Sequence, residues 1–88
     1  MTEPEIRQAI FEALHQVAPE ADAQHIRENE NLREALDIDS FDFLNVLIGL
    51  HERIGVEIPE ADYGQLTTVS ALIQYLSRKL AGAHRTDS

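Results

Sequence analysis

The amino-acid sequence predicts an all-α fold, a small bundle of three main helices and one short helix with a long first loop. Three segments carry apolar residues at the three- and four-residue spacing of an amphipathic helix, and no run alternates with the period of two that marks a strand. The chain has 88 residues, enough for one small hydrophobic core and too few for two. We therefore expect a single domain over residues 1–81, followed by a flexible C-terminal tail over 82–88.

The first helix is predicted over residues 3–17. Thr2 and Glu5 have the spacing of a capping box at its start, and Pro19 lies just beyond its end. A polar stretch of about twenty residues follows, which is long for a loop in so small a domain. Within that stretch, a helical turn is expected at Leu32 to Leu36.

The second main helix is predicted from Ser40 to about Ile54. Asp39 is a favourable N-cap residue, and Gly55 can end the helix in the left-handed conformation. These two signals give this helix clear local limits.

A short helix and a last main helix complete the bundle. The short one is predicted from Glu60 to Tyr63, broken by Gly64, and the last begins after Thr67 or Thr68. The last helix carries an apolar stripe formed by Val69, Leu72, Ile73, Leu76 and Leu80.

Charge and composition exclude several classes of function. Sixteen acidic and seven basic side chains give a net charge of −9, so nucleic acids and anionic membrane surfaces would repel the chain, and we expect no nucleic-acid binding. Basic surfaces of partner proteins would attract it. The segment MTEPEIRQ is unlike a signal peptide, and no apolar stretch approaches the roughly 20 residues that span a bilayer. We expect a cytoplasmic protein with no integral membrane segment.

The residues do not suggest a metal site. The chain has no cysteine, and its four histidines lack metal-ligand spacing. The segment from Asp37 to Asp42 begins like a calcium loop, but Phe41, Asp42 and Ile48 stand where that loop needs Asp or Asn, Gly and Glu. We therefore expect no metal ligands.

No catalytic residue is visible either, and Ser40 has no base beside it. The nearest histidine in its helix, His51, lies about 16 Å away along the helix axis. Two roles are open to Ser40: it helps Asp39 to cap the helix, or its hydroxyl is modified by another enzyme. Local chemistry alone favours capping.

Three motifs resemble those of the acyl carrier protein family, in the same order along the chain. Residues 36–42, LDIDSFD, are similar to the family's L-G-x-D-S-L-D; residues 56–59, VEIP, resemble its x-E-I-P; and residues 68–75, TVSALIQY, resemble its T-V-x-x-x-I-x-Y. The resemblance implies an acyl-carrier-like bundle in which Ser40, presented by Asp39, covalently holds 4'-phosphopantetheine.

The same resemblance implies a carrier rather than an enzyme. A separate phosphopantetheinyl transferase attaches the arm, acyl groups travel on it as thioesters, and acyl-loading and acyl-processing enzymes are the other partners of a monomeric protein. Two alternatives remain open at this point. The chain could carry aminoacyl or peptidyl groups, or it could be an unmodified helical adaptor.

The sequence departs from the family pattern at four positions. Asp37 stands where the family usually has glycine. In the second main helix, Asn45, His51 and Arg53 stand where members usually carry glutamates. These departures favour a specialised carrier in a lipid or secondary-metabolite pathway over the bulk carrier of fatty acid biosynthesis.

On a helical wheel, the apolar residues of the second main helix form two groups. One group, Phe43, Val46, Leu47, Leu50 and Ile54, suffices to pack on the other helices. The other group, Phe41, Leu44 and Ile48, forms an apolar edge that faces partners or, alternatively, is covered by the long loop or the short helix. The expected partner-binding residues are Phe41, Asp42, Leu44, Asn45, Ile48 and Glu52, and the expected acyl-cavity residues are Phe43, Leu47, Ile58, Leu66, Val69 and Leu72.

Overall fold

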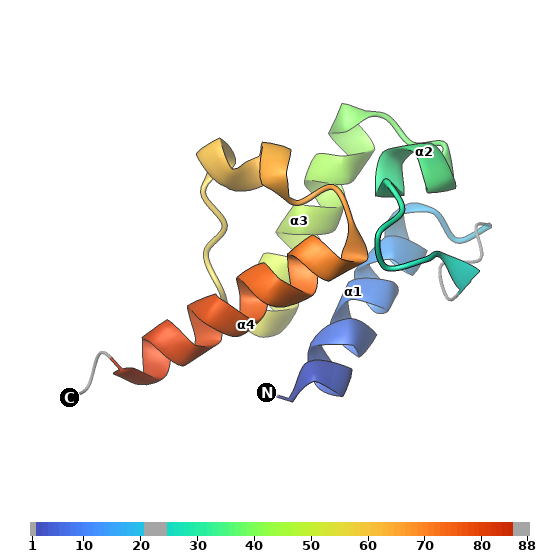
Figure 1. Ribbon diagram of the computed structural model, residues 1–88. Coiled ribbons are helices and arrows are strands. Elements are labelled where there is room, and N and C mark those ends of the chain that lie inside the picture. The colour runs from blue at the N-terminus through green and yellow to red at the C-terminus, as the bar shows by residue number, and fades with distance from the viewer. Residues whose placement is uncertain (1, 21–24, 86–88) are drawn as a thin grey trace.

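The computed structural model describes the backbone of residues 2–20 and 25–85, and the side chains of residues 2–20 and 25–81. The described residues form helices and no strand, which confirms the all-α prediction. α1 packs against both α3 and α4, and α2 lies at the end of the bundle where α3 begins (Figure 1). The elements in order are α1 (Glu3–Val17), α2 (Leu32–Leu36), α3 (Ser40–Ile54), the 3-10 helix η2 (Glu60–Gln65) and α4 (Val69–Arg85).

Local hydrogen bonds set the ends of α1 and α3 where the sequence predicts them. The Thr2 backbone N–H donates to Glu5 Oε1 over 2.8 Å, and this bond is the main reason that the pKa of Glu5 is lowered. Asp39 Oδ1 accepts from the Asp42 N–H over 2.9 Å at the start of α3. At its other end, Gly55 has a φ of 78°, the left-handed conformation that terminates the helix.

The prediction that Gly64 breaks the short helix is wrong. The element is a 3-10 helix that continues through Gly64 to Gln65, closed by a bond from the Leu66 N–H to the Tyr63 carbonyl (3.1 Å). A 3-10 turn needs only three residues, and glycine weakens such a turn through backbone entropy rather than through a clash.

The start of α4 agrees with the sequence and its end lies further on. Thr68 is the cap, since its Oγ1 accepts from the Ala71 N–H over 3.1 Å. The helix then extends to Arg85, past the predicted domain boundary at residue 81, because Ala81 and Ala83 are strong helix formers. Residues 86–88 of the predicted tail lie outside the described residues.

The apolar core joins all four α-helices and the segments around η2. Four of the five residues assigned to packing on α3 are buried, and the fifth, Ile54, is half-buried. No polar or charged side chain of the described residues is buried. The fully enclosed larger side chains are Ile6, Ile10, Leu14, Leu32, Val46, Leu47, Leu50, Leu66, Val69, Leu72 and Leu76.

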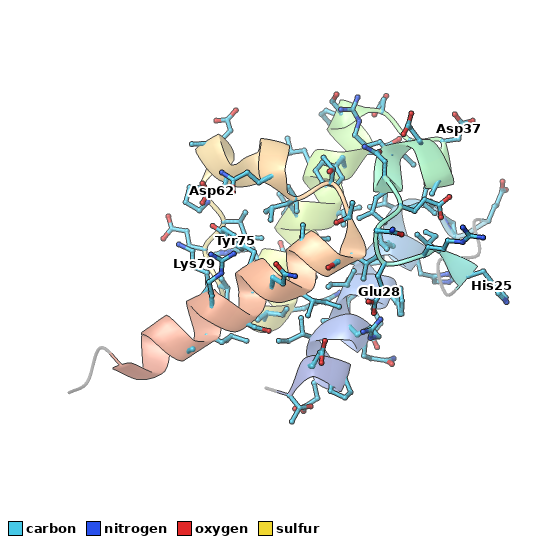
Figure 2. The ribbon with its side chains drawn as sticks, viewed as in Figure 1. His25, Glu28, Asp37, Asp62, Tyr75 and Lys79 are labelled. Carbon is cyan, nitrogen blue, oxygen red and sulfur yellow. The ribbon has the colours of Figure 1, made fainter. Side chains whose placement is uncertain are left out.

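Backbone hydrogen bonds hold the long segment before α3 on the bundle. The Leu32 N–H donates to the Thr67 carbonyl over 2.8 Å, and the Ser70 N–H donates to the Glu28 carbonyl over 2.8 Å. Arg7 of α1 also forms an ion pair with Glu28, which lies between α1 and the start of α4 (Figure 2). These contacts hold the segment that contains α2 against α1 and the start of α4.

A second set of contacts joins η2 to α4. The Tyr75 hydroxyl donates to Asp62 Oδ2 over 2.7 Å, and Lys79 Nζ lies 5.4 Å from the centre of the Tyr75 ring (Figure 2). Burial, and then the bond to Asp62, raise the pKa of Tyr75 to about 12. The neutral phenol is thus the form that the fold favours.

We expect Tyr75→Phe to lower the free energy of unfolding by about 1 kcal/mol at neutral pH, because it removes this bond. The raised pKa stabilises the fold fully below pH 10.0, the ordinary value, and that stability is lost as the pH rises toward about 12. In urea unfolding, the free energy of unfolding should therefore decline less between pH 7 and pH 12 in Tyr75→Phe than in wild type. Tyr63→Phe is the matched control, and an equal decline in all three proteins would contradict the assignment.

Candidate modification site

Ser40 is the first residue of α3, and its side chain is exposed. The capping bond comes from Asp39 alone, which accepts from the Asp42 N–H. The Ser40 hydroxyl forms no hydrogen bond with the described residues. Of the two roles that local chemistry leaves open, capping is therefore taken by Asp39, and the Ser40 hydroxyl is free to react.

The Ser40 side chain opens onto a cavity of about 220 Å³. Four parts of the chain build it: α2, the first turns of α3, η2 and the segment before α4. Its lining is mixed, with two aromatic rings and an aliphatic side chain beside three hydroxyl groups and a guanidinium. The lining residues are Arg33, Ser40, Phe43, Leu44, Tyr63, Gly64 and Thr67.

A left-handed turn at Asp37 places α2 against Ser40. Asp37 has a φ of 55°, and its N–H donates to the Arg33 carbonyl. The Ile38 N–H donates to the same carbonyl over 3.0 Å, so the chain folds back sharply after α2. Figure 2 shows Asp37 at this corner, between α2 and the start of α3.

The left-handed conformation of Asp37 is unfavourable for a residue with a Cβ atom and would not be unfavourable for glycine. We expect Asp37→Gly to raise the free energy of unfolding by about 0.5 to 1 kcal/mol, less than the full left-handed penalty because glycine also loosens the unfolded chain. Glu34→Gly removes the same charge from an ordinary helical position in α2 and should lower the stability by about 1 kcal/mol. Urea unfolding of both variants measures the contrast, and a loss of stability in Asp37→Gly would refute the idea.

The residues predicted to line an acyl cavity divide into two sets. Phe43 lines the cavity at Ser40. The others lie in the closed hydrophobic core and do not line that cavity, so their role around an acyl chain stays a prediction. These core residues are Leu47, Ile58, Leu66, Val69 and Leu72, each at most 8% exposed.

The residues predicted to bind partners also divide. Leu44 is half-buried and lines the cavity at Ser40. Phe41 is 70% exposed and Ile48 is 44% exposed, so neither the described part of the long loop nor η2 covers them. A shallow groove of about 440 Å³ gathers four of the predicted residues with the end of α1. Its lining residues are Gln16, Val17, Asp42, Asn45, Ile48, Gly49 and Glu52.

Two of the three α3 residues that differ from the family pattern make contacts with other residues of this chain. Arg53 Nη1 forms an ion pair with Glu12 Oε1 of α1 at 3.0 Å, and His51 Nδ1 donates to the Val56 carbonyl oxygen over 2.8 Å. Asn45 is exposed in the groove. Of the three positions, only Asn45 is thus presented beside Asp42 and Glu52.

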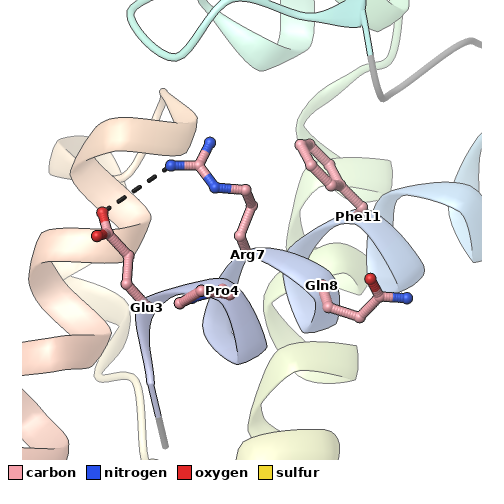
Figure 3. A pocket seen from close by; sticks show the side chains of 5 residues that line it. All are labelled: Glu3, Pro4, Arg7, Gln8 and Phe11. Atoms are coloured by element: carbon pink, nitrogen blue, oxygen red, sulfur yellow. Dashed lines mark ion pairs between the residues drawn. The ribbon is translucent and has the colours of Figure 1, made fainter.

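Another depression, of about 410 Å³, lies on the first turns of α1 and contains none of the predicted site residues (Figure 3). Its Arg7 and Glu3 side chains approach to 3.9 Å. No group of three His, Cys, Asp or Glu side chains that could hold a metal ion occurs in the described part of the chain. Nor does any described helix have the length and apolar character needed to cross a membrane.

Sequence reasoning missed four residues beside Ser40: Arg33, Tyr63, Gly64 and Thr67. A helical wheel cannot place η2 or α2 over α3, because their position depends on the turn at Asp37 and on contacts with α4. One signal was available for Arg33, since a basic side chain close in sequence to Ser40 stands out among acidic neighbours.

Comparison with known proteins relates most of the chain to a single family. Residues 5–76 match the family model described as a phosphopantetheine attachment site. An acyl carrier protein of Lactobacillus johnsonii is 33% identical over 76 residues, which covers 86% of this chain and 94% of the relative. An acyl carrier protein of Chlamydia caviae is 36% identical over 58 residues, covering 66% of this chain and 75% of the relative.

The fold also has a counterpart among solved structures. The solution structure of a protein from Anaplasma phagocytophilum, described as an acyl carrier protein, superposes with a TM-score of 0.77 at 28% identity. The match covers 90% of this chain and 92% of the other.

Proposed function

The chain belongs to the acyl carrier protein family, so its cofactor is a covalently bound 4'-phosphopantetheine, and we propose that the Ser40 hydroxyl carries it. The observation that supports this attachment is the free, exposed hydroxyl of Ser40 at the mouth of a cavity. Acyl carrier proteins are carriers rather than enzymes. We infer that this chain likewise performs no catalysis and presents acyl groups, as thioesters, to other enzymes.

The residues around Ser40 suit a phosphodiester. Asp39 holds the first turn of α3, and the backbone N–H groups of that turn not used by Asp39 favour a phosphate beside them. The cavity leaves room beside the hydroxyl, and Arg33 contributes a positive charge to its lining. When bound, the arm supplies the thiol that a chain without cysteine lacks.

Partner enzymes would dock along α3. Carriers of this family work with a phosphopantetheinyl transferase and with acyl-processing enzymes. The groove offers the carboxylates of Asp42 and Glu52 to basic surfaces, and Ile48 and Phe41 supply exposed apolar area next to them. We therefore propose this groove as the contact surface. Cytoplasmic location and a monomeric state stay predictions from the sequence.

The decisive experiment is a loading assay on the unmodified protein. Incubation with coenzyme A, Mg²⁺ and a promiscuous phosphopantetheinyl transferase should increase the intact mass by one phosphopantetheine. A known carrier loaded in parallel controls for transferase activity. If the control is loaded and this protein is not, the helical adaptor becomes the better interpretation.

We further propose a specialised pathway rather than bulk fatty acid synthesis. The support comes from α3, where Asn45 occupies the groove at a position at which the resemblance leads us to expect a glutamate. The engagement of His51 and Arg53 within the fold means that their substitution would disturb the protein itself. Asn45 is therefore the position at which to test partner choice.

We expect Asn45→Glu to improve elongation by general fatty acid synthesis enzymes, because it adds a carboxylate that can pair with a basic partner surface. One exposed ion pair is worth about 0 to 1 kcal/mol, so kcat/KM should rise by about fivefold or less. Gln74→Glu adds the same charge at an exposed position on α4 and should have little effect. Elongation of the wild-type protein at the rate of a general carrier would contradict the specialised role.

A further inference from the structure

The cavity at Ser40 is lined by one basic side chain, that of Arg33. We propose that Arg33 binds the phosphodiester on Ser40 and so positions the first part of the arm over the cavity. This inference rests on the proposed attachment at Ser40. It concerns a residue outside the motifs that carry the family resemblance.

The backbone fixes the position of Arg33 relative to Ser40. Its carbonyl accepts from the N–H groups of both Asp37 and Ile38. The chain therefore reverses directly after α2, and the residues before Ser40 lie close to the Arg33 backbone. Both Arg33 and Ser40 then face the same cavity. A group on the Ser40 oxygen would enter the space that the Arg33 side chain lines.

Arg33 is also available for a new partner. Arg7 and Arg53 form ion pairs, and Lys79 lies over the Tyr75 ring. The Arg33 guanidinium, by contrast, forms no ion pair or hydrogen bond with the described residues. Arg27 and Arg78 likewise form no ion pair with the described residues, but of these unpaired arginines Arg33 alone lines the cavity at Ser40.

The local charge favours a phosphodiester contact. Asp37, Asp39 and Asp42 surround Ser40 in the sequence, and the phosphodiester adds a further negative charge there. A planar guanidinium can donate two parallel hydrogen bonds to phosphate oxygens. Because Arg33 is exposed, the contact is weak and sensitive to salt, so it biases the direction of the arm without locking it.

The test compares the unmodified and the phosphopantetheine-loaded protein by NMR. Loading of wild type should shift the Nε–H resonance of Arg33 and leave that of Arg78, an exposed arginine on α4, in place. The ³¹P resonance of the loaded protein should move in Arg33→Gln, stay in Arg78→Gln and be partly restored in Arg33→Lys. High salt should reduce the difference between wild type and Arg33→Gln.

Intact mass, measured on every sample, separates failure of this inference from failure of the proposed function. If wild type gains no phosphopantetheine, both are overturned. If wild type is loaded but the Arg33 Nε–H and the ³¹P resonance respond no more than in the Arg78 control, only the role of Arg33 is overturned. Circular dichroism of unmodified Arg33→Gln should match wild type, because this side chain is exposed and makes no contact that the fold needs.

Discussion

Ser40→Ala is expected to abolish phosphopantetheine addition completely, since it removes the only atom that can accept the phosphate at this position. The hydroxyl makes no hydrogen bond with the described residues, and Asp39 supplies the cap. The free energy of unfolding should therefore change by no more than about 0.5 kcal/mol. Intact mass after the loading assay and urea unfolding measure the two effects separately.

Ser70→Ala is the matched control for this experiment. Ser70 also lies in the first turn of a helix, at the start of α4, and should leave loading unchanged. Addition of phosphopantetheine to Ser40→Ala would place the attachment at another residue.

Leu76→Ala should produce a large loss of stability. Leu76 is fully buried in the middle of α4, and truncation of such a leucine removes apolar contacts and leaves a cavity. The expected cost is about 2 to 5 kcal/mol, which is a large part of the roughly 5 to 15 kcal/mol that stabilises a typical domain. Urea unfolding at neutral pH measures it.

Gln74→Ala, an exposed change in the same helix, should alter the stability by less than about 0.5 kcal/mol. If Leu76→Ala changes the stability as little as this control does, Leu76 does not pack in the core as the structure shows.

The main helices could be predicted from the sequence because their signals are local. The cap at Asp39 and the left-handed Gly55 depend on neighbouring residues, and α3 begins and ends where these signals predict. The apolar stripe of α4 is likewise a property of one segment. In the structure, Val69, Leu72, Ile73 and Leu76 of that stripe are buried.

Features that depend on two distant segments could not be predicted in this way. The helical wheel places Arg53 on the polar side of α3 but cannot show that Glu12 of α1 lies within reach. The bond between Tyr75 and Asp62 holds η2 on α4, and no local pattern in either segment indicates it. A turn signal such as Gly64 is therefore a poor guide where tertiary contacts hold the backbone.

The candidate site shows the same division. The motif around Ser40 predicts this serine as the modified residue, and the structure shows that its side chain is exposed. The surrounding cavity, however, is assembled from α2, α3, η2 and the segment before α4. A helical wheel shows directions and not neighbours, so it predicts partner contact for Leu44 and Phe41 alike. The structure places Leu44 in the lining of the cavity at Ser40 and leaves Phe41 exposed outside it.

The two backbone hydrogen bonds between the long segment and the start of α4 have a consequence for the order of folding. They join Leu32 to Thr67 and Glu28 to Ser70, residues far apart along the chain. Closing such a loop costs entropy that is recovered only after α4 has docked. The segment and α2 should therefore order late, so that substitutions in them accelerate unfolding more than they slow refolding. The complete cavity around Ser40 would then form only in nearly native molecules.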